Sequence, residues 1–183
     1  MNKIWNLPNI LSMFRILLVI PMGIALWNQE NVIAVLISIL SSITDNLDGY
    51  FARRLNQITE FGKMIDPLSD KLFVGVIVII LLIQSRMPLW FALVIWGRDL
   101  LLMLGGLWAS KKIGWVLPSN VLGKLTVTIL GFTLMFIMLD IKLIATWGIW
   151  ISTFFLTFSF VYYTIRMLMV LNKQNKIEKS AEK

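Results

Sequence analysis

The sequence contains no cysteine and no histidine, and each absence excludes a class of chemistry. Without cysteine there is no disulfide, no thiolate nucleophile and no thiolate metal site. Without histidine there is no imidazole base, no Ser-His-Asp triad and none of the usual zinc ligands. Acid–base chemistry in this chain must therefore use carboxylates, lysine, tyrosine or water.

Charged residues are also scarce. They make up 15% of the 183 residues, whereas 58% are hydrophobic, and the mean hydropathy is +0.80. A soluble domain contains about 45–50% apolar residues, so this composition places the chain in a membrane. The net charge of +7 comes from basic residues at segment ends and in the tail. Attraction to anionic lipid headgroups explains this positive charge better than binding to a nucleic acid does.

Six apolar segments are long enough to cross a bilayer, which takes about 20 residues. They cover residues 11–27, 31–53, 66–84, 88–109, 120–139 and 143–171. Residues 1–10, which include Pro8, predict a short helix lying in the membrane interface. The sequence thus predicts an all-α integral membrane protein with six transmembrane helices, a membrane domain over 1–171 and a polar, frayed or disordered tail over 172–183.

Basic residues are divided unequally between the two ends of these segments. The connections 28–30, 85–87 and 140–142 carry only Arg86 and Lys142. The opposite side carries Lys3, Arg53, Arg54, Lys63, Lys111, Lys112, Lys124, Lys173, Lys176, Lys179 and Lys183. Cytoplasmic connections are enriched in Lys and Arg. Both termini, and the junction of the second and third segments, are therefore predicted on the cytoplasmic side of the cell (inner) membrane.

Four aspartates, Asp45, Asp48, Asp66 and Asp70, flank that junction. Acidic groups in apolar segments are costly and usually functional. Residues three or four apart share a helix face, so the aspartates form two stripes, which antiparallel packing across residues 54–65 would bring together. Empty carboxylates so arranged would repel one another. Oxygen ligands favour Mg²⁺ or Mn²⁺, and four carboxylates suit two ions, an arrangement common in phosphate transfer.

Small and polar residues accompany the aspartates. Gly49 and Ala52 remove side-chain bulk, so that a planar ring or a phosphate can approach the helix backbone. Arg53 can pair with a phosphate oxygen, and Thr59 offers a hydroxyl. Gly62 permits a backbone conformation that a side chain would resist. The sequence therefore predicts a site for metal ions and a phosphate-bearing ligand.

The pattern Asp-x2-Asp-Gly-x2-Ala-Arg-x8-Gly-x3-Asp-x3-Asp resembles the signature of the CDP-alcohol phosphatidyltransferase family. In this chain its fixed positions are Asp45, Asp48, Gly49, Ala52, Arg53, Gly62, Asp66 and Asp70. Fixed residues at fixed spacing make such a signature highly specific. Residues 8–15, Pro-Asn-Ile-Leu-Ser-Met-Phe-Arg, are also similar to the opening of bacterial members of this family. The resemblance covers nearly the whole chain.

The resemblance implies an enzyme that transfers the phosphatidyl group of CDP-diacylglycerol to the hydroxyl of a small alcohol and releases CMP. It implies that Asp45, Asp48 and Asp66 bind the metal ions, and that Asp70 both binds metal and deprotonates the acceptor. The CDP moiety would be held by Gly49, Ala52 and Arg53, with Thr59, Gly62, Pro8 and Asn9 nearby. Related enzymes are commonly homodimers, which makes a dimer an expectation by analogy.

An anionic acceptor such as glycerol 3-phosphate needs a basic pocket, for which the candidates are Arg98, Lys124 and Arg15. Residues 123–126, Gly-Lys-Leu-Thr, resemble a segment of family members that use glycerol 3-phosphate. Arg98-Asp99 departs from the Arg-Glu of many of these and also occurs in family members that use phosphatidylglycerol. Glycerol 3-phosphate is thus the leading expectation, with phosphatidylglycerol or another alcohol as the alternative. Arg98 could instead pair structurally with Asp99, and Lys124 could be an interfacial anchor.

A membrane protein of another class, a divalent-cation or proton-coupled transporter, would also need intramembrane acids. Transporters usually place such acids near the midplane, in discontinuous helices or repeated halves. Here the aspartates cluster toward one face, and the sequence shows no internal repeat. This pattern favours the enzyme.

Overall fold

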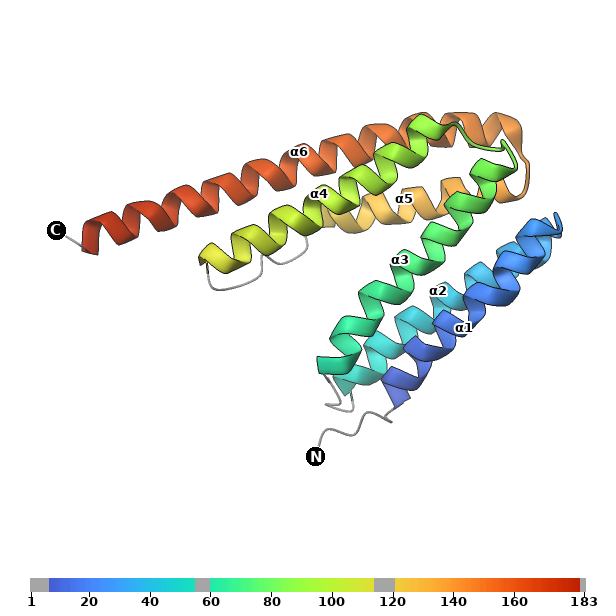
Figure 1. The fold of residues 1–183 in the computed structure, drawn as a ribbon, viewed down its shortest axis with the longest axis horizontal. Coiled ribbons are helices and arrows are strands. Elements are labelled where there is room, and N and C mark those ends of the chain that lie inside the picture. Colours follow the sequence, from blue (N-terminus) through green and yellow to red (C-terminus); the bar gives the residue numbers. More distant parts are fainter. Residues whose placement is uncertain (1–6, 55–59, 114–120, 182–183) are drawn as a thin grey trace. The chain divides into compact units, whose positions relative to one another are not determined.

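The computed structural model describes residues 7–54, 60–113 and 121–181, and every regular element in these ranges is an α-helix (Figure 1). The helices are α1 (Leu7–Trp27), α2 (Asn31–Arg54), α3 (Glu60–Ile83), α4 (Leu89–Ile113), α5 (Val121–Met138) and α6 (Lys142–Ala181). The predicted all-α class is confirmed. The chain divides into two compact units, Met1–Met87 with Leu134–Ile141 and Pro88–Thr133 with Lys142–Lys183.

Several of these helices are suited to a lipid environment. Among the described residues, the segments long and apolar enough to cross a membrane are Asn9–Trp27, Leu89–Gly106, Val121–Met138 and Lys142–Leu171. α2 opens with a shorter apolar stretch, Asn31–Asp45. On α1 the large side chains of Leu17, Ile20 and Ile24 point outward and are exposed. An outward apolar face needs a nonpolar solvent, and the chain is a multi-pass membrane protein.

The start of the chain differs from the predicted interfacial helix. Residues 7–10 belong to α1, while residues 1–6 lie outside the described residues. The prediction of a separate helix over 1–10 is therefore wrong for residues 7–10, which are part of α1. The physical reason is that proline is tolerated in the first turn of a helix. Pro8, directly after Leu7, does not interrupt α1.

Two other helices are longer than predicted. α3 begins at Glu60 instead of residue 66, so that Pro67 lies inside the helix. An acidic residue at a helix start interacts favourably with the helix dipole, which fits a start at Glu60. α6 continues to Ala181, so that residues 172–181 are helical where a frayed or disordered tail was predicted. This stretch is rich in Lys, Glu and Gln, which are good helix formers.

In the first unit, α1 packs against both α2 and α3 (Figure 1). Gly23 marks the close approach of α1 to α3. A Cβ built there would lie 3.4 Å from Cγ1 of Val76 and 3.7 Å from Cδ1 of Ile80. Buried apolar side chains such as Met22 and Leu81 fill the contact region. This packing fixes α2 and α3 relative to α1.

Three helices of this unit end in the same kind of turn. The backbone φ angle is 62° at Gln29, 56° at Ser85 and 58° at Asp140, a left-handed conformation that glycine usually supplies at helix ends. The next N–H in each turn donates to the carbonyl five residues back, namely Glu30 to Ala25, Arg86 to Leu81 and Ile141 to Phe136. α1, α3 and α5 therefore end in the Schellman hydrogen-bond pattern.

Side chains connect these helix ends. Nη1 of Arg86 donates to Oδ1 of Asn31 at 2.9 Å, and its Nη2 donates to the Met138 carbonyl at 3.1 Å. Nε2 of Gln84 donates to the Leu26 carbonyl at 2.9 Å. The last carbonyls of a helix have no partner within it, and these donors satisfy two of them. These hydrogen bonds therefore connect the helix ends of the first unit that lie opposite to the aspartates.

In the second unit α6 contacts α4 and α5 through small and polar groups as well as apolar ones. Ala109 of α4 and Leu171 of α6 are buried together. The Thr133 and Ser152 hydroxyl oxygens lie 2.7 Å apart, and the Thr133 hydroxyl also donates to the Gly148 carbonyl at 3.2 Å. Small residues that allow close approach, joined by hydroxyl hydrogen bonds, are typical of helix packing in membranes.

Replacing Gly148 with alanine is expected to weaken the contact between α5 and α6. The added Cβ would stand 2.9 Å from Oγ1 and 3.1 Å from Cγ2 of Thr133, so the Thr133 side chain or one of the two helices must shift. We expect Gly148→Ala to lower the thermal unfolding midpoint by about 3–8 °C, measured by tryptophan fluorescence in detergent. Gly131→Ala is the matched control, because nothing lies within 4 Å of its added Cβ, and it should cause no loss.

The cause can be checked by adding Thr133→Ala to Gly148→Ala. This second change removes the opposing atoms, although it also removes the hydroxyl that bonds to Ser152. The double variant is expected to be more stable than the sum of the two single effects predicts. Strict additivity would contradict a steric origin.

Candidate functional site

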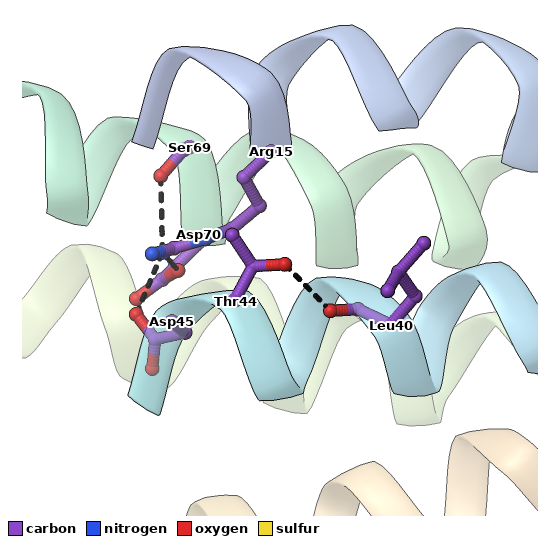
Figure 2. A network of polar contacts seen from close by, with 6 residues as sticks. All are labelled: Arg15, Leu40, Thr44, Asp45, Ser69 and Asp70. Carbon is purple, nitrogen blue, oxygen red and sulfur yellow. Dashed lines mark hydrogen bonds and ion pairs between the residues drawn. The ribbon is translucent and has the colours of Figure 1, made fainter. Parts of the chain in front are cut away.

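Asp45 and Asp70, two of the four predicted metal ligands, have described side chains, and both contact Arg15 of α1 (Figure 2). Nη1 of Arg15 lies 2.7 Å from Oδ1 of Asp45 and 2.5 Å from Oδ1 of Asp70. The same nitrogen donates to Oγ of Ser69 at 3.3 Å. Three helices, α1, α2 and α3, therefore contribute side chains to one point.

Helix packing explains why these side chains meet. α1 lies against both α2 and α3, and its buried face near the start carries polar residues. Asn9, Ser12 and Arg15 follow at three-residue intervals and are all buried, as helical spacing requires for one face. Ser12 and the buried Ser69 were not among the predicted site residues. The sequence signal for Ser12 was its place midway between two predicted residues.

Burial differs sharply between the partners at this point. The side chain of Arg15 is 2% exposed, whereas those of Asp45 and Asp70 are 47% and 55% exposed. The guanidinium thus lies beneath the carboxylates, which keep part of their surface accessible. A buried charge is costly unless it is paired, and the two aspartates supply that pairing.

The structure describes less of the other residues predicted around the aspartates. Asp48 lies in α2 and Asp66 in α3, at the positions that helical spacing requires. Their side chains lie outside the described part, as do those of Pro8, Gly49, Ala52, Arg53 and Gly62. Thr59 belongs to residues 55–59, outside the described residues. Among the side chains that are described, no three acidic groups gather, since two of the predicted four are not included.

The described residues fit a divalent cation. Carboxylate oxygens are the ligands that Mg²⁺ and similar hard ions prefer. Asp45 and Asp70 come from different helices and direct one oxygen each at the same positively charged nitrogen. Their oxygens already converge on a cation, and both carboxylates retain exposed surface. The site can therefore hold positive charge between α2 and α3.

The predicted acceptor residues Arg98 and Lys124 lie in the second unit. Nη1 of Arg98 pairs with Oδ1 of Asp99 at 2.7 Å. Nη2 of Arg98 donates to Oγ of Ser159 at 3.4 Å. Its Nε is buried and has no hydrogen-bond partner in the described part of the chain. Lys124 is exposed.

Arg98 of α4 and Thr126 of α5 both contact α6. Arg98 reaches Ser159, while the hydroxyl of Thr126, two residues after Lys124, donates to the Phe155 carbonyl at 3.4 Å. Phe155 and Ser159 are one helical turn apart, which is about 6 Å along the axis. Arg98 and Thr126 therefore contact α6 about one turn apart, whereas Lys124 is exposed and, being two residues from Thr126, lies on another face of α5.

Comparison with known proteins agrees with this architecture. Residues 5–159 match the family model described as CDP-alcohol phosphatidyltransferase. The chain belongs to the CDP-alcohol phosphatidyltransferase family and is an enzyme of this class, as the signature predicted. The enzyme class also sets aside the transporter interpretation.

Individual relatives support the same assignment. A CDP-diacylglycerol–glycerol-3-phosphate 3-phosphatidyltransferase of Rickettsia typhi is 39% identical, covering 75% of this chain and 78% of its own. A protein of the same name from Bacillus subtilis is 38% identical, covering 66% and 70%. A cardiolipin synthase (CMP-forming) of Streptomyces coelicolor is 36% identical, covering 67% and 60%. This chain is thus similar to enzymes with two different names.

Proposed function

We propose that this protein transfers the phosphatidyl group of CDP-diacylglycerol to glycerol 3-phosphate, giving phosphatidylglycerophosphate and CMP. It would act as a CDP-diacylglycerol–glycerol-3-phosphate 3-phosphatidyltransferase in phospholipid biosynthesis. The observation that carries the proposal is the convergence of Asp45 and Asp70 in a chain of this family. The names of relatives such as those from Rickettsia typhi and Bacillus subtilis support glycerol 3-phosphate as the acceptor.

The proposed site holds two divalent cations, Mg²⁺ or Mn²⁺. We assign them to Asp45, Asp48, Asp66 and Asp70, because hard oxygen ligands suit these ions. When bound, the ions would supply positive charge that offsets the pyrophosphate and the charge developing on the leaving phosphate. The contact of both Asp45 and Asp70 with one nitrogen of Arg15 supports this assignment.

The substrate would be held beside the aspartates. We assign the CDP moiety to Gly49, Ala52 and Arg53, with Thr59, Gly62, Pro8 and Asn9 nearby. The absence of bulk at the two small residues would let the nucleotide approach α2, and the arginine would pair with a phosphate oxygen. The burial of Asn9 on the face of α1 that carries Arg15 supports placing this face beside the site.

Asp70 is assigned as the base. It would take the proton from the acceptor hydroxyl while the acceptor oxygen forms a bond to the phosphorus of the phosphatidyl group. The bond from that phosphorus to the oxygen of CMP breaks, and CMP leaves with the electron pair. A carboxylate is a weak base for an alcohol, so proton removal must accompany bond formation.

The acceptor phosphate is assigned to Arg98 and Lys124. The buried Nε of Arg98 supports this role, because an unsatisfied buried donor gains from a new acceptor. Lys124 belongs to the same unit as Arg98 and is exposed. Arg15, the third predicted group, is buried and paired with carboxylates, which disfavours a phosphate there.

The proposed setting is the inner membrane, with both termini and the aspartates on the cytoplasmic side. The excess of Lys and Arg at that end of the segments supports this orientation. Residues 1–171 would form the membrane domain and residues 172–183 a polar cytoplasmic tail. Membrane lipids would surround the apolar outer faces, and a homodimer is proposed by analogy with the family.

An acceptor screen tests this function. Purified enzyme is given labelled CDP-diacylglycerol with glycerol 3-phosphate, phosphatidylglycerol, serine or inositol phosphate, and CMP and the lipid product are measured. We expect turnover with glycerol 3-phosphate. Arg98→Ala should raise the KM for this acceptor about 30- to 100-fold, as for loss of a charged hydrogen bond. Lys142→Ala, at an exposed position outside the proposed pocket, is the control. Turnover with phosphatidylglycerol alone would contradict the acceptor and favour a cardiolipin synthase.

A further inference from the structure

The surroundings of Arg15 are those of a counterion and not of a group awaiting a substrate. Its guanidinium is 2% exposed and contacts two carboxylates through one nitrogen. An acceptor phosphate would need to reach that guanidinium from outside and would meet the negative charge of Asp45 and Asp70 first. Like charges brought this close repel, so the position disfavours a phosphate.

The same position favours a role toward the aspartates themselves. Asp45 and Asp70 belong to different helices, and without a cation their facing oxygens would repel and separate. With Arg15 present, the three side chains carry one net negative charge in place of two. Because Arg15 approaches from the buried side, both carboxylates keep about half of their side-chain surface exposed, 47% for Asp45 and 55% for Asp70.

We propose that Arg15 is a positioning residue that acts as a built-in cation. It holds Asp45 and Asp70 together while no divalent ion is bound, and it competes with that ion for their oxygens once it arrives. The inference rests on the proposed function, because it takes these two aspartates to be metal ligands. It replaces the role of Arg15 at the acceptor phosphate.

The proposal predicts how the loss of Arg15 changes the effect of a divalent ion on stability. In Arg15→Met the carboxylates repel one another when no ion is bound, so the metal-free protein loses stability. An added divalent ion then relieves that repulsion without a competitor. Since ligands that bind only the folded state raise its stability, the metal-induced rise in unfolding midpoint becomes larger than in the wild type.

The measurement is the thermal unfolding midpoint in detergent, with EDTA and with saturating MgCl₂. The eight tryptophans of the chain provide the fluorescence signal. We expect Arg15→Met to lower the EDTA midpoint by about 5–10 °C and to recover at least half of this in Mg²⁺. Arg15→Lys keeps a cation and is expected to lie between the wild type and Arg15→Met in both conditions.

Arg86→Met is the matched control. Arg86 is also a largely buried arginine of the first unit, but it bonds to Asn31 and the Met138 carbonyl at the other end. Its loss is expected to lower the midpoint equally with and without metal. An equal loss in Arg15→Met would show a merely structural role and overturn the inference. So would an unchanged metal response combined with a raised KM for the acceptor.

A second variant covers the case in which Arg15→Met does not fold. Adding Asp70→Asn removes one of the two repelling charges, so Arg15→Met/Asp70→Asn is expected to fold in EDTA. Failure of this double variant as well, while Asp70→Asn alone folds, would overturn the inference.

The wild type separates this inference from the proposed function. If it shows neither metal-dependent turnover nor a metal-dependent midpoint, the metal-dependent function fails and the role of Arg15 fails with it. If the wild type responds to metal and Arg15→Met responds no more strongly, only the role of Arg15 fails.

Discussion

Asp70→Asn is expected to lower CMP release from CDP-diacylglycerol by about 10³-fold or more, because it removes the proposed base, which is also a proposed metal ligand. Asparagine has nearly the same size, and its side-chain oxygen can still accept a hydrogen bond from Arg15. It cannot take a proton from an alcohol. The loss should therefore appear in kcat, measured as CMP formed per enzyme at saturating CDP-diacylglycerol and acceptor.

Asp140→Asn provides the comparison. Asp140 is 54% exposed, close to the value for Asp70, but it lies in the turn after α5, 4.0 Å from Arg86. The same chemical change there should leave turnover within about twofold, as expected for an exposed, weakly paired surface charge. If Asp70→Asn kept more than a tenth of wild-type turnover, the assigned base would be wrong.

The location of the site was predictable because helical spacing translates directly into shared faces. Asp45 and Asp70 were assigned to two facing stripes, and their side chains are indeed directed to one point. The connection over residues 54–65 was expected to let the second and third segments pack antiparallel and bring the two stripes together. Charge asymmetry then predicted that the end carrying the acids faces the cytoplasm.

The contact of Arg15, on α1, with the two aspartates could not be predicted in the same way. An arginine in an apolar helix has at least two explanations, a ligand for an anion and a partner for a buried carboxylate. Arg15 was assigned to the first, because the sequence does not reveal that α1 packs on both α2 and α3. Only that packing brings the guanidinium beneath Asp45 and Asp70.

Helix boundaries were missed for a related reason. The apolar segments of α3 and α6 were recognised from hydrophobicity, which reports burial in lipid and not helix length. α3 extends back to Glu60 and α6 extends to Ala181, through polar residues that continue the helix. In α3 this places Asp66 and Asp70 inside the helix and not in its first turn.

Removing divalent cations is expected to stop turnover, with CMP release falling by more than about 100-fold after dialysis against EDTA. The reason is electrostatic. A nucleotide diphosphate carries negative charge to a site that already contains Asp45 and Asp70, and the single cation described there, Arg15, is bound to both. Adding Mg²⁺ or Mn²⁺ in excess over the chelator should restore the rate.

The metal requirement can be tied to particular carboxylates by titration. Asp45→Ala removes one assigned ligand, so the Mg²⁺ concentration for half-maximal turnover should rise roughly tenfold or more. Glu30→Ala removes an exposed carboxylate just before α2 and should leave the titration unchanged. Full turnover in EDTA would contradict a metal site at the aspartates. A rise in both variants would instead point to a general effect of surface charge, because only Asp45 faces the point where the three helices meet.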